Sequence, residues 1–136
     1  MKKQKGFTIL ELLITMAIFA ILTSIVLISM TTVKEKNRDA VRMSHLKQIE
    51  NALNLYYSNN NVFPIAAAQI DITGSDALSI ALENDGATRE VQPDPLHPNV
   101  VYTYQSVDGT TYTVTFCLET NTIQSYSQGC GNTLTP

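Results

Sequence analysis

The chain has 136 residues, of which 44% are hydrophobic and 7% aromatic, and its formal net charge is -3 at pH 7. This size suits one small domain plus one membrane segment. The absence of internal repeats and low-complexity tracts excludes repeat and low-complexity proteins. Charge is uneven: bases gather in the first five residues, whereas residues 51–136 hold eight acids and one base. This acidic second half argues against a nucleic-acid-binding surface.

Residues 7–30 form an apolar stretch in which Glu11 is the one formal charge, with no glycine or proline. As a helix it would be roughly 35 Å long, enough to cross a hydrocarbon core of about 30 Å. The apolar region of a cleaved secretory signal is shorter, about 7 to 15 residues, and ends at a small-x-small site. A fully apolar helix in a soluble protein would need a large core, for which few residues remain. The stretch therefore predicts a membrane-spanning helix.

The residues around its start, Lys5-Gly6-Phe7-Thr8-Ile9-Leu10-Glu11, follow a short basic leader. This pattern closely resembles the N-terminal signature of type IV pilins and type II secretion pseudopilins, a class III signal peptide with a prepilin-type methylation motif. The resemblance implies a leader of residues 1–6 that a prepilin peptidase removes by cutting after Gly6. It also implies that Phe7 becomes the N-methylated first residue of the mature chain.

Glu11 lies inside the apolar stretch. A carboxylate at mid-membrane costs about 2.5 to 3.5 kcal/mol on insertion scales, so it usually marks a function. The resemblance implies that Glu11 acts in assembly, by meeting the cationic N-terminus of a neighbouring subunit. Such a buried charge pair fixes register more than it adds stability. The alternative is that Glu11 lies near the end of the segment and reaches the lipid headgroups.

Residues 31–60 predict an amphipathic helical stem that continues the membrane helix. Apolar residues recur every three or four positions, which indicates one buried stripe: Met43, Leu46, Ile49, Leu53 and Tyr56. The charges between residues 34 and 50 indicate either a solvated face or ion pairs with neighbouring subunits. Asparagines at 59–61, followed by Phe63-Pro64, predict the end of the stem. The family's helix-breaking proline and glycine are absent, with Ile28 and Ala20 in their places, so we expect the helix to stay continuous.

Residues 61–99 predict a connector with one short helix, which has an apolar stripe at 77–82, ends near Asn84-Asp85-Gly86 and is capped by side chains of residues 73–76. Asp94-Pro95 resembles an element that precedes the sheet in many pseudopilins. Residues 100–136 predict an antiparallel sheet and a C-terminal tail, with strands at 100–105, 112–118 and 122–126. Asp108-Gly109 is a turn signal between the first two strands. The predicted fold is α+β, a pilin-like lollipop with one long N-terminal helix packed on a small three- or four-stranded antiparallel sheet.

Cys117 and Cys130 would close a loop of about 14 residues, which a disulfide would stabilise by about 3 kcal/mol. The spacing is neither C-x-x-C nor a zinc arrangement, so the alternatives are a disulfide and two free thiols. Major pseudopilins, which resemble this fold, often bind calcium through aspartates in a loop near the C-terminus. Residues 127–136 contain no acid, so a calcium site is not supported and no metal or other cofactor is predicted. This departure favours a pilus subunit over a secretion pseudopilin.

The predicted function is structural: a subunit of a type IV pilus or pilus-like filament, assembled by helix packing. The alternatives are a type II secretion or competence pseudopilin, or a minor pilin acting as an adhesin or DNA-binding tip. No catalytic residues are predicted, because the chain has no H-E-x-x-H motif or glycine-rich phosphate loop. The resemblance implies a homo-oligomeric helical filament, a prepilin peptidase, an assembly ATPase and a membrane platform as partners. It places the chain first as a single-pass protein in the cell membrane and then in a bacterial cell-surface filament.

Overall fold

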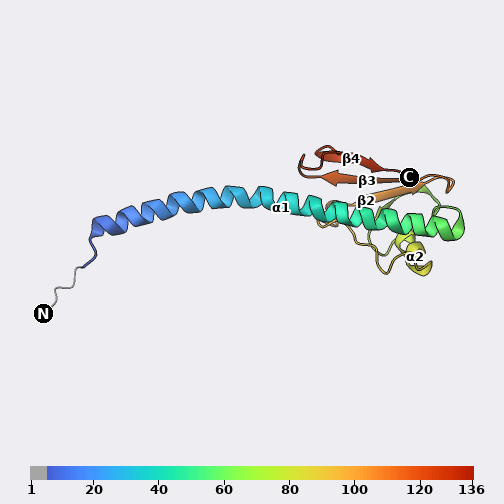
Figure 1. Ribbon diagram of the computed structural model, residues 1–136, viewed down its shortest axis with the longest axis horizontal. Helices are drawn as coiled ribbons and strands as arrows, with labels where there is room; N and C mark the ends of the chain where they lie inside the picture. Colours follow the sequence, from blue (N-terminus) through green and yellow to red (C-terminus); the bar gives the residue numbers. More distant parts are fainter. Residues whose placement is uncertain (1–5) are drawn as a thin grey trace. The chain divides into compact units, whose positions relative to one another are not determined.

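The computed structural model describes residues 6–136, apart from the side chains of residues 26–29. The chain divides into two units, residues 1–34 and residues 35–136. Helix α1 (Ile9–Asn60, 52 residues) begins in the first unit and ends in the second (Figure 1). No glycine or proline interrupts residues 9–60, and the backbone of residues 20–28 is helical. Whether the helix stays continuous in a filament remains a prediction. Most of the predicted leader, residues 1–5, lies outside the described residues.

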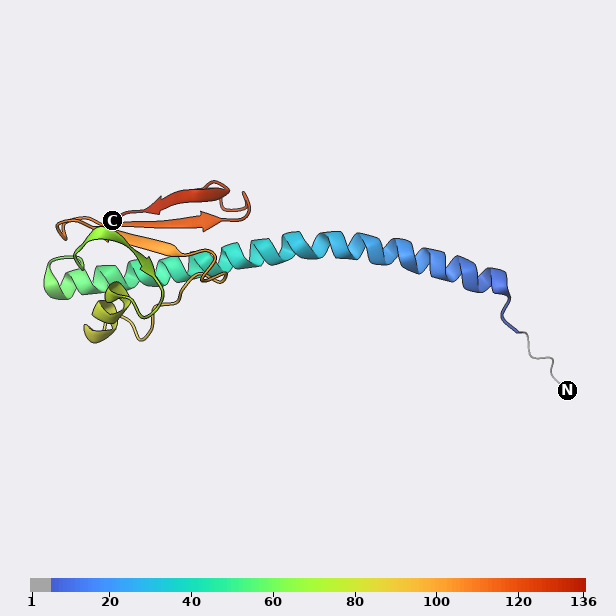
Figure 2. The same cartoon turned by 180° about the vertical axis from the view of Figure 1, so that it is seen from behind.

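The second unit combines the C-terminal part of α1 with a four-stranded antiparallel sheet. The strands are β1 (Ala66–Ile72), β2 (Tyr102–Ser106), β3 (Thr113–Leu118) and β4 (Gly129–Leu134), in the spatial order β1-β2-β3-β4. Figures 1 and 2 show the sheet and the short helix α2 (Ala77–Asn84) on opposite sides of this part of α1. This α+β arrangement confirms the predicted fold class.

The core lies between the stem of α1 and one face of the sheet. Leu46, Ile49 and Leu53 are buried, and Met43 and Tyr56 pack partly buried beside them, which confirms the predicted stripe. Strands β2 and β3 alternate buried and half-buried residues, as the period of two in a strand requires. Their buried side chains are Tyr102, Tyr104, Ser106, Val114, Phe116 and Leu118.

The stem ends where the asparagines predicted it. Asn61 follows the last helical residue and adopts a left-handed conformation with φ 56°, which asparagine tolerates better than most residues. Its N–H donates to the Tyr57 carbonyl at 2.7 Å, and the Asn60 side chain donates to the Tyr56 carbonyl at 3.0 Å. These bonds satisfy carbonyls that the end of a helix would otherwise leave unpaired.

Helix α2 begins and ends close to its predicted limits. Asp76 is the N-cap, and its carboxylate accepts hydrogen bonds from Ser79 N and Thr73 N at 3.1 and 2.8 Å. Burial raises the pKa of Asp76, but hydrogen bonds from Ser79 Oγ, Ser79 N and Thr73 N outweigh burial and hold it below its usual value. Gly86, just after the helix, has φ 76°, a conformation that favours glycine.

Two strands differ from the sequence prediction. Residues 66–72, predicted as part of the connector, form β1, which pairs with β2 and shifts register between Ala66 and Ile70. Three consecutive alanines carry little strand preference, so pairing with β2 decides this conformation. Residues 122–126, predicted as a strand, instead form a turn in which Tyr126 N donates to the Ile123 carbonyl. The fourth strand lies further on, at 129–134.

Candidate functional site

A cluster of charged side chains at the start of the second unit joins α1 to two loops. Arg42 is fully buried and makes four hydrogen bonds to three carboxylates. Its Nε and Nη2 donate to the two oxygens of Asp94, at 2.8 and 3.1 Å. Its Nη1 donates to Asp39 at 2.9 Å and to Glu119 at 2.6 Å. The forked guanidinium therefore holds together three segments that are distant in sequence.

The carboxylates of this cluster have further donors. Asp39 accepts from Glu119 N, Thr120 N and Thr120 Oγ1 at 2.7 to 2.9 Å. Arg38 donates to both oxygens of Glu119, and Leu96 N donates to Asp94 at 2.8 Å. We call Arg38, Asp39, Arg42, Asp94 and Glu119 the ion cluster.

Hydrogen bonding lowers the pKa values of two carboxylates in the ion cluster, Glu119 and Asp39. Hydrogen bonds from Arg38, and then from Arg42, lower the pKa of Glu119 to about 2. Burial raises the pKa of Asp39, but hydrogen bonds from Glu119 N, Thr120 and Arg42 outweigh it and keep it below its usual value. Asp39 and Glu119 can thus stay ionised beside the guanidinium, as a buried charge requires a partner.

The ion cluster corrects the prediction for the charges of the stem. Both alternatives, a solvated face and pairing between subunits, are wrong for Asp39 and Arg42, which are fully buried and paired within the chain. The signal available in the sequence was the i, i+3 spacing of Asp39 and Arg42. The distant carboxylates Asp94 and Glu119 left no such local signal.

The two cysteines are joined. Cys117 in β3 and Cys130 in β4 lie opposite each other in the sheet and form a disulfide. Of the two alternatives that the sequence left open, the structure therefore contains the disulfide. It fixes the pairing of β4, which has only one neighbouring strand.

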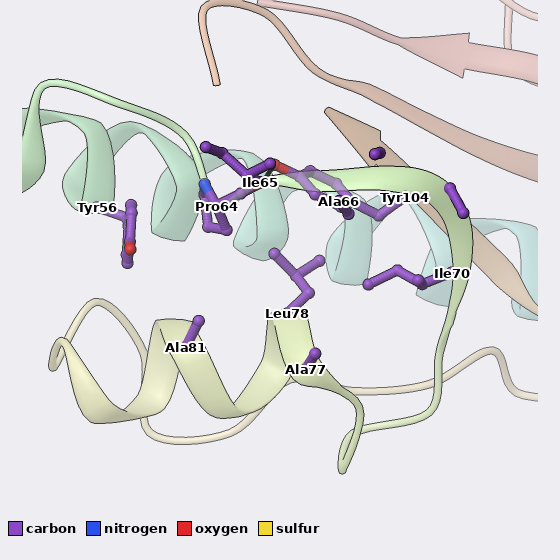
Figure 3. Close-up of a pocket in the computed structure, with 11 residues that line it drawn as sticks. Tyr56, Pro64, Ile65, Ala66, Ile70, Ala77, Leu78, Ala81 and Tyr104 are labelled. Atoms are coloured by element: carbon purple, nitrogen blue, oxygen red, sulfur yellow. Dashed lines mark hydrogen bonds between the residues drawn. The ribbon is translucent and has the colours of Figure 1, made fainter. Parts of the chain in front are cut away.

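An apolar hollow of about 350 Å³ lies between α1, β1 and α2 (Figure 3). Its walls include Tyr56, Ile65, Ile70, Leu78 and Tyr104, without a charged side chain. The Tyr104 hydroxyl donates to the Pro64 carbonyl at 2.7 Å, so it has a partner. The hollow offers no group for acid–base or nucleophilic chemistry. Among residues 6–136, no group of three or more His, Cys, Asp or Glu is placed to hold a metal ion.

The segment before α1 has no packing contacts at Gly6 within the described residues and is open to other molecules. Residues 6–8 precede α1 and are exposed, and a Cβ added to Gly6 would meet nothing within 4 Å. The packing of the chain itself therefore does not require glycine at this position. Phe7 is 78% exposed.

Thr8 and Glu11 form a capping box at the start of α1. Glu11 N donates to Thr8 Oγ1 at 3.2 Å, and Thr8 N and Oγ1 both donate to Glu11 Oε2 at 2.9 Å. The carboxylate also lies in the first helical turn, where the helix dipole favours negative charge. Within the described residues Oε1 of Glu11 has no hydrogen-bond partner, so this oxygen is available to another group.

The first half of α1 is apolar and open to its surroundings. One stretch of the helix is long and apolar enough to cross a membrane, and none of that stretch is buried within the chain. Its large exposed hydrophobic residues outside positions 26–29 are Ile9, Leu10, Leu12, Leu13, Ile14, Met16, Ile18, Phe19, Ile21, Leu22, Ile25 and Met30. This surface needs lipid or protein to cover it.

Residues 1–27 match the family model for the prokaryotic N-terminal methylation motif. The chain carries a prepilin-type methylation motif. The predicted resemblance to pilins and pseudopilins is confirmed at this level, and the motif covers Gly6, Phe7 and Glu11. Cleavage, methylation and assembly at these residues stay predictions.

Curated relatives that share the resemblance are named type II secretion system core protein G. The protein of Aeromonas hydrophila is 34% identical over 70 residues, which is 52% of this chain and 49% of the relative. The proteins of Vibrio cholerae and Escherichia coli are 38% and 36% identical over 64 and 62 residues, covering 47% and 46% of this chain and 44% and 43% of theirs. The matches thus span about half the length of these relatives or less. No solved structure matches the chain significantly.

Proposed function

We propose that the chain is a pseudopilin, a structural subunit of a filament of the type II secretion kind. The observation that carries the proposal is the methylation motif at the start of the apolar first part of α1, where the side chains of residues 9–25 are exposed. The relatives named core protein G of the type II secretion system support this alternative better than the type IV pilus placed first by the sequence analysis.

In this proposal a prepilin peptidase cuts the chain between Gly6 and Phe7, and Phe7 is methylated. The accessible segment supports this step, because Gly6 and Phe7 are exposed and Gly6 has no packing role in the chain. A residue without a side chain lets a protease approach the backbone closely. In this proposal Gly6 is therefore required by the peptidase and not by the packing of the chain.

The exposed apolar surface of α1 anchors the chain in the membrane before assembly and packs against other copies afterwards. Apolar surface that moves from lipid to protein gains no hydrophobic driving force, so packing and polar contacts must select the arrangement. Glu11 fits this role, because its Oε1 is available to the amino terminus of a neighbouring subunit. An assembly ATPase and a membrane platform are the further partners that the proposal requires.

The ion cluster keeps the loops beside the sheet attached to the stem in this proposal. Arg42 lies on α1, whereas Asp94 and Glu119 lie in the loops before β2 and after β3. Pulling α1 away from the sheet would separate buried charges, which is costly in a low-dielectric interior. A subunit that is drawn into a filament by its helix would therefore carry its sheet with it.

The first experiment is intact-mass analysis of the chain purified from the membrane fraction of its host. Wild type should begin at Phe7 and carry one added methyl group. Gly6→Val should begin at Met1, because its side chain blocks the approach of the peptidase. Gln4→Val, with the same side chain two positions earlier, is the matched control and should mature normally. An uncut wild-type chain would contradict the proposal.

A type IV pilus subunit is the second candidate, favoured by the lack of acids in residues 127–136. Shearing separates the two candidates. A pilus subunit should be abundant in fibres sheared from cells, whereas a secretion pseudopilin should remain with the membrane. If the chain is a secretion pseudopilin, deleting its gene should abolish the export of secreted proteins. If it is a pilus subunit, the deletion should leave export intact.

A further inference from the structure

The loop between β3 and β4 is held by side-chain amides. Gln128 Nε2 donates to the Glu119 carbonyl at 2.8 Å, and Asn132 Nδ2 donates to the Ser127 and Gly129 carbonyls at 2.8 and 3.0 Å. The amide oxygen of Asn132 accepts from Ser127 N at 3.0 Å. Three backbone carbonyls, two in this loop and one at the start of β4, thus already have N–H donors.

The start of this loop is also held by α1. Asp39 accepts hydrogen bonds from the backbone N–H groups of Glu119 and Thr120, at 2.9 and 2.8 Å. On the β4 side the Cys117–Cys130 disulfide closes the loop. The loop is therefore fixed at both ends and tied across its middle.

These residues do not fit a calcium ion, which the resemblance to major pseudopilins would suggest for a loop near the C-terminus. Ca²⁺ takes six to eight oxygen ligands and prefers carboxylates, yet residues 120–136 contain no acid. Glu119 is engaged by Arg38 and Arg42. The Asn132 nitrogen donates to the carbonyls that would have to face a cation, and a donor cannot be a ligand.

We infer that the Cys117–Cys130 disulfide and the amides of Gln128 and Asn132 hold this loop in place of a divalent cation. The stability of the second unit then depends on thiol oxidation and is independent of calcium. This inference goes beyond the proposed function and does not rest on it. Forming the bond removes two electrons and two protons from the two thiols. They pass to the disulfide of a protein oxidant by thiol–disulfide exchange, which leaves that oxidant with two thiols.

The test measures thermal unfolding of the purified full chain in detergent, followed by near-ultraviolet circular dichroism. Oxidised and reduced chain are each heated with millimolar calcium and with a chelator. Calcium should not shift the unfolding midpoint in either redox state. Reduction should lower it by on the order of 10 °C, as loss of a disulfide that closes a loop of this length predicts. A midpoint raised by calcium in either state, or unchanged by reduction, would overturn the inference.

Variants test the two parts separately. Cys117→Ser/Cys130→Ser should reproduce the lower midpoint of the reduced chain without reductant, and a wild-type midpoint would overturn the inference. Asn132→Asp places a carboxylate against two carbonyl oxygens and should lower the midpoint by several degrees. The matched control is Asn99→Asp at an exposed position. Equal midpoints for the two aspartate variants would mean that the Asn132 amide does not hold the loop.

Discussion

Replacing Arg42 by methionine tests the ion cluster, because it removes the shared cation and leaves a side chain of similar length. The three carboxylates then differ in what remains to them. Asp39 keeps three donors from Glu119 and Thr120, and Glu119 keeps Arg38. Asp94, which is 3% exposed, keeps only the N–H of Leu96 within the described structure. The cost of the substitution is therefore concentrated at Asp94.

Removing one partner of a buried ion pair typically costs about 3 to 5 kcal/mol, since the other charge is left buried. Two of the four lost hydrogen bonds are to Asp94, so we expect Arg42→Met to fall in this range. For a unit of about 100 residues this lowers the thermal midpoint by on the order of 15 °C. Arg42→Met/Asp94→Asn removes the orphaned charge as well and should recover at least about 1 kcal/mol relative to Arg42→Met.

The assay is denaturant unfolding of the full chain in detergent, with tyrosine fluorescence reporting on the second unit. Lys47→Met is the matched control: Lys47 pairs with Glu50, but its side chain is 65% exposed, and such surface pairs contribute at most about 1 kcal/mol. If Arg42→Met costs no more than Lys47→Met, or if the double variant is less stable than Arg42→Met, the argument from buried charge is wrong.

Three further predictions concern the pH response, a turn and the start of α1. Because the pKa of Glu119 falls from 4.5 to about 2 on folding, its stabilising effect is complete above about pH 4.5 and is lost as pH falls towards 2. The thermal midpoint should therefore fall across this range more steeply for wild type than for Glu119→Gln. Gly109→Ala should cost about 2 kcal/mol in denaturant unfolding, because φ is 75° and a Cβ would lie 2.1 Å from the Val62 side chain. Thr8→Ala removes the cap that pairs with Glu11, and should speed amide exchange in the first turn of α1 by a factor corresponding to about 1 kcal/mol.

Each of these has its own control. Parallel pH curves for wild type and Glu119→Gln would contradict the assigned role of Glu119. Gly86→Ala isolates the conformational cost, since Gly86 has φ 76° but its Cβ would meet nothing within 4 Å. It should cost less than Gly109→Ala. Thr32→Ala, an exposed position within α1, should leave exchange in the first turn unchanged.

The helices could be predicted because their signals are local. The apolar run from residue 7, the stripe from Met43 to Tyr56 and the caps at Asp76 and Asn61 each depend on neighbours within one or two turns. The same is true of β2 and β3, where alternation and the Asp108-Gly109 turn lie next to each other in sequence. The structure confirms all of these elements, with small shifts at their ends.

The edge strands and the ion cluster could not be predicted because long-range pairing decides them. The paired residues of strands β1 and β2 lie 30 to 40 positions apart in the sequence, and the alanines of β1 do not favour a strand by themselves. Residues 122–126 have the composition of a strand, yet β3 pairs with residues beyond them, where Cys130 meets Cys117. Arg42 and Glu119 are likewise 77 residues apart, so their contact leaves no periodicity in the sequence.

The exposed first half of α1 also predicts how inactivating substitutions should affect the cellular abundance of the subunit. The described side chains of residues 9–25 are exposed in the single chain, so substitutions there leave its own core unchanged. Substitutions at buried positions such as Leu53 or Phe116 reduce stability, and unstable proteins are cleared by cellular proteases. A random mutant library should therefore separate into two groups of inactive clones. Those altered in residues 9–25 should accumulate subunit at normal levels, whereas those altered in the core should lose it.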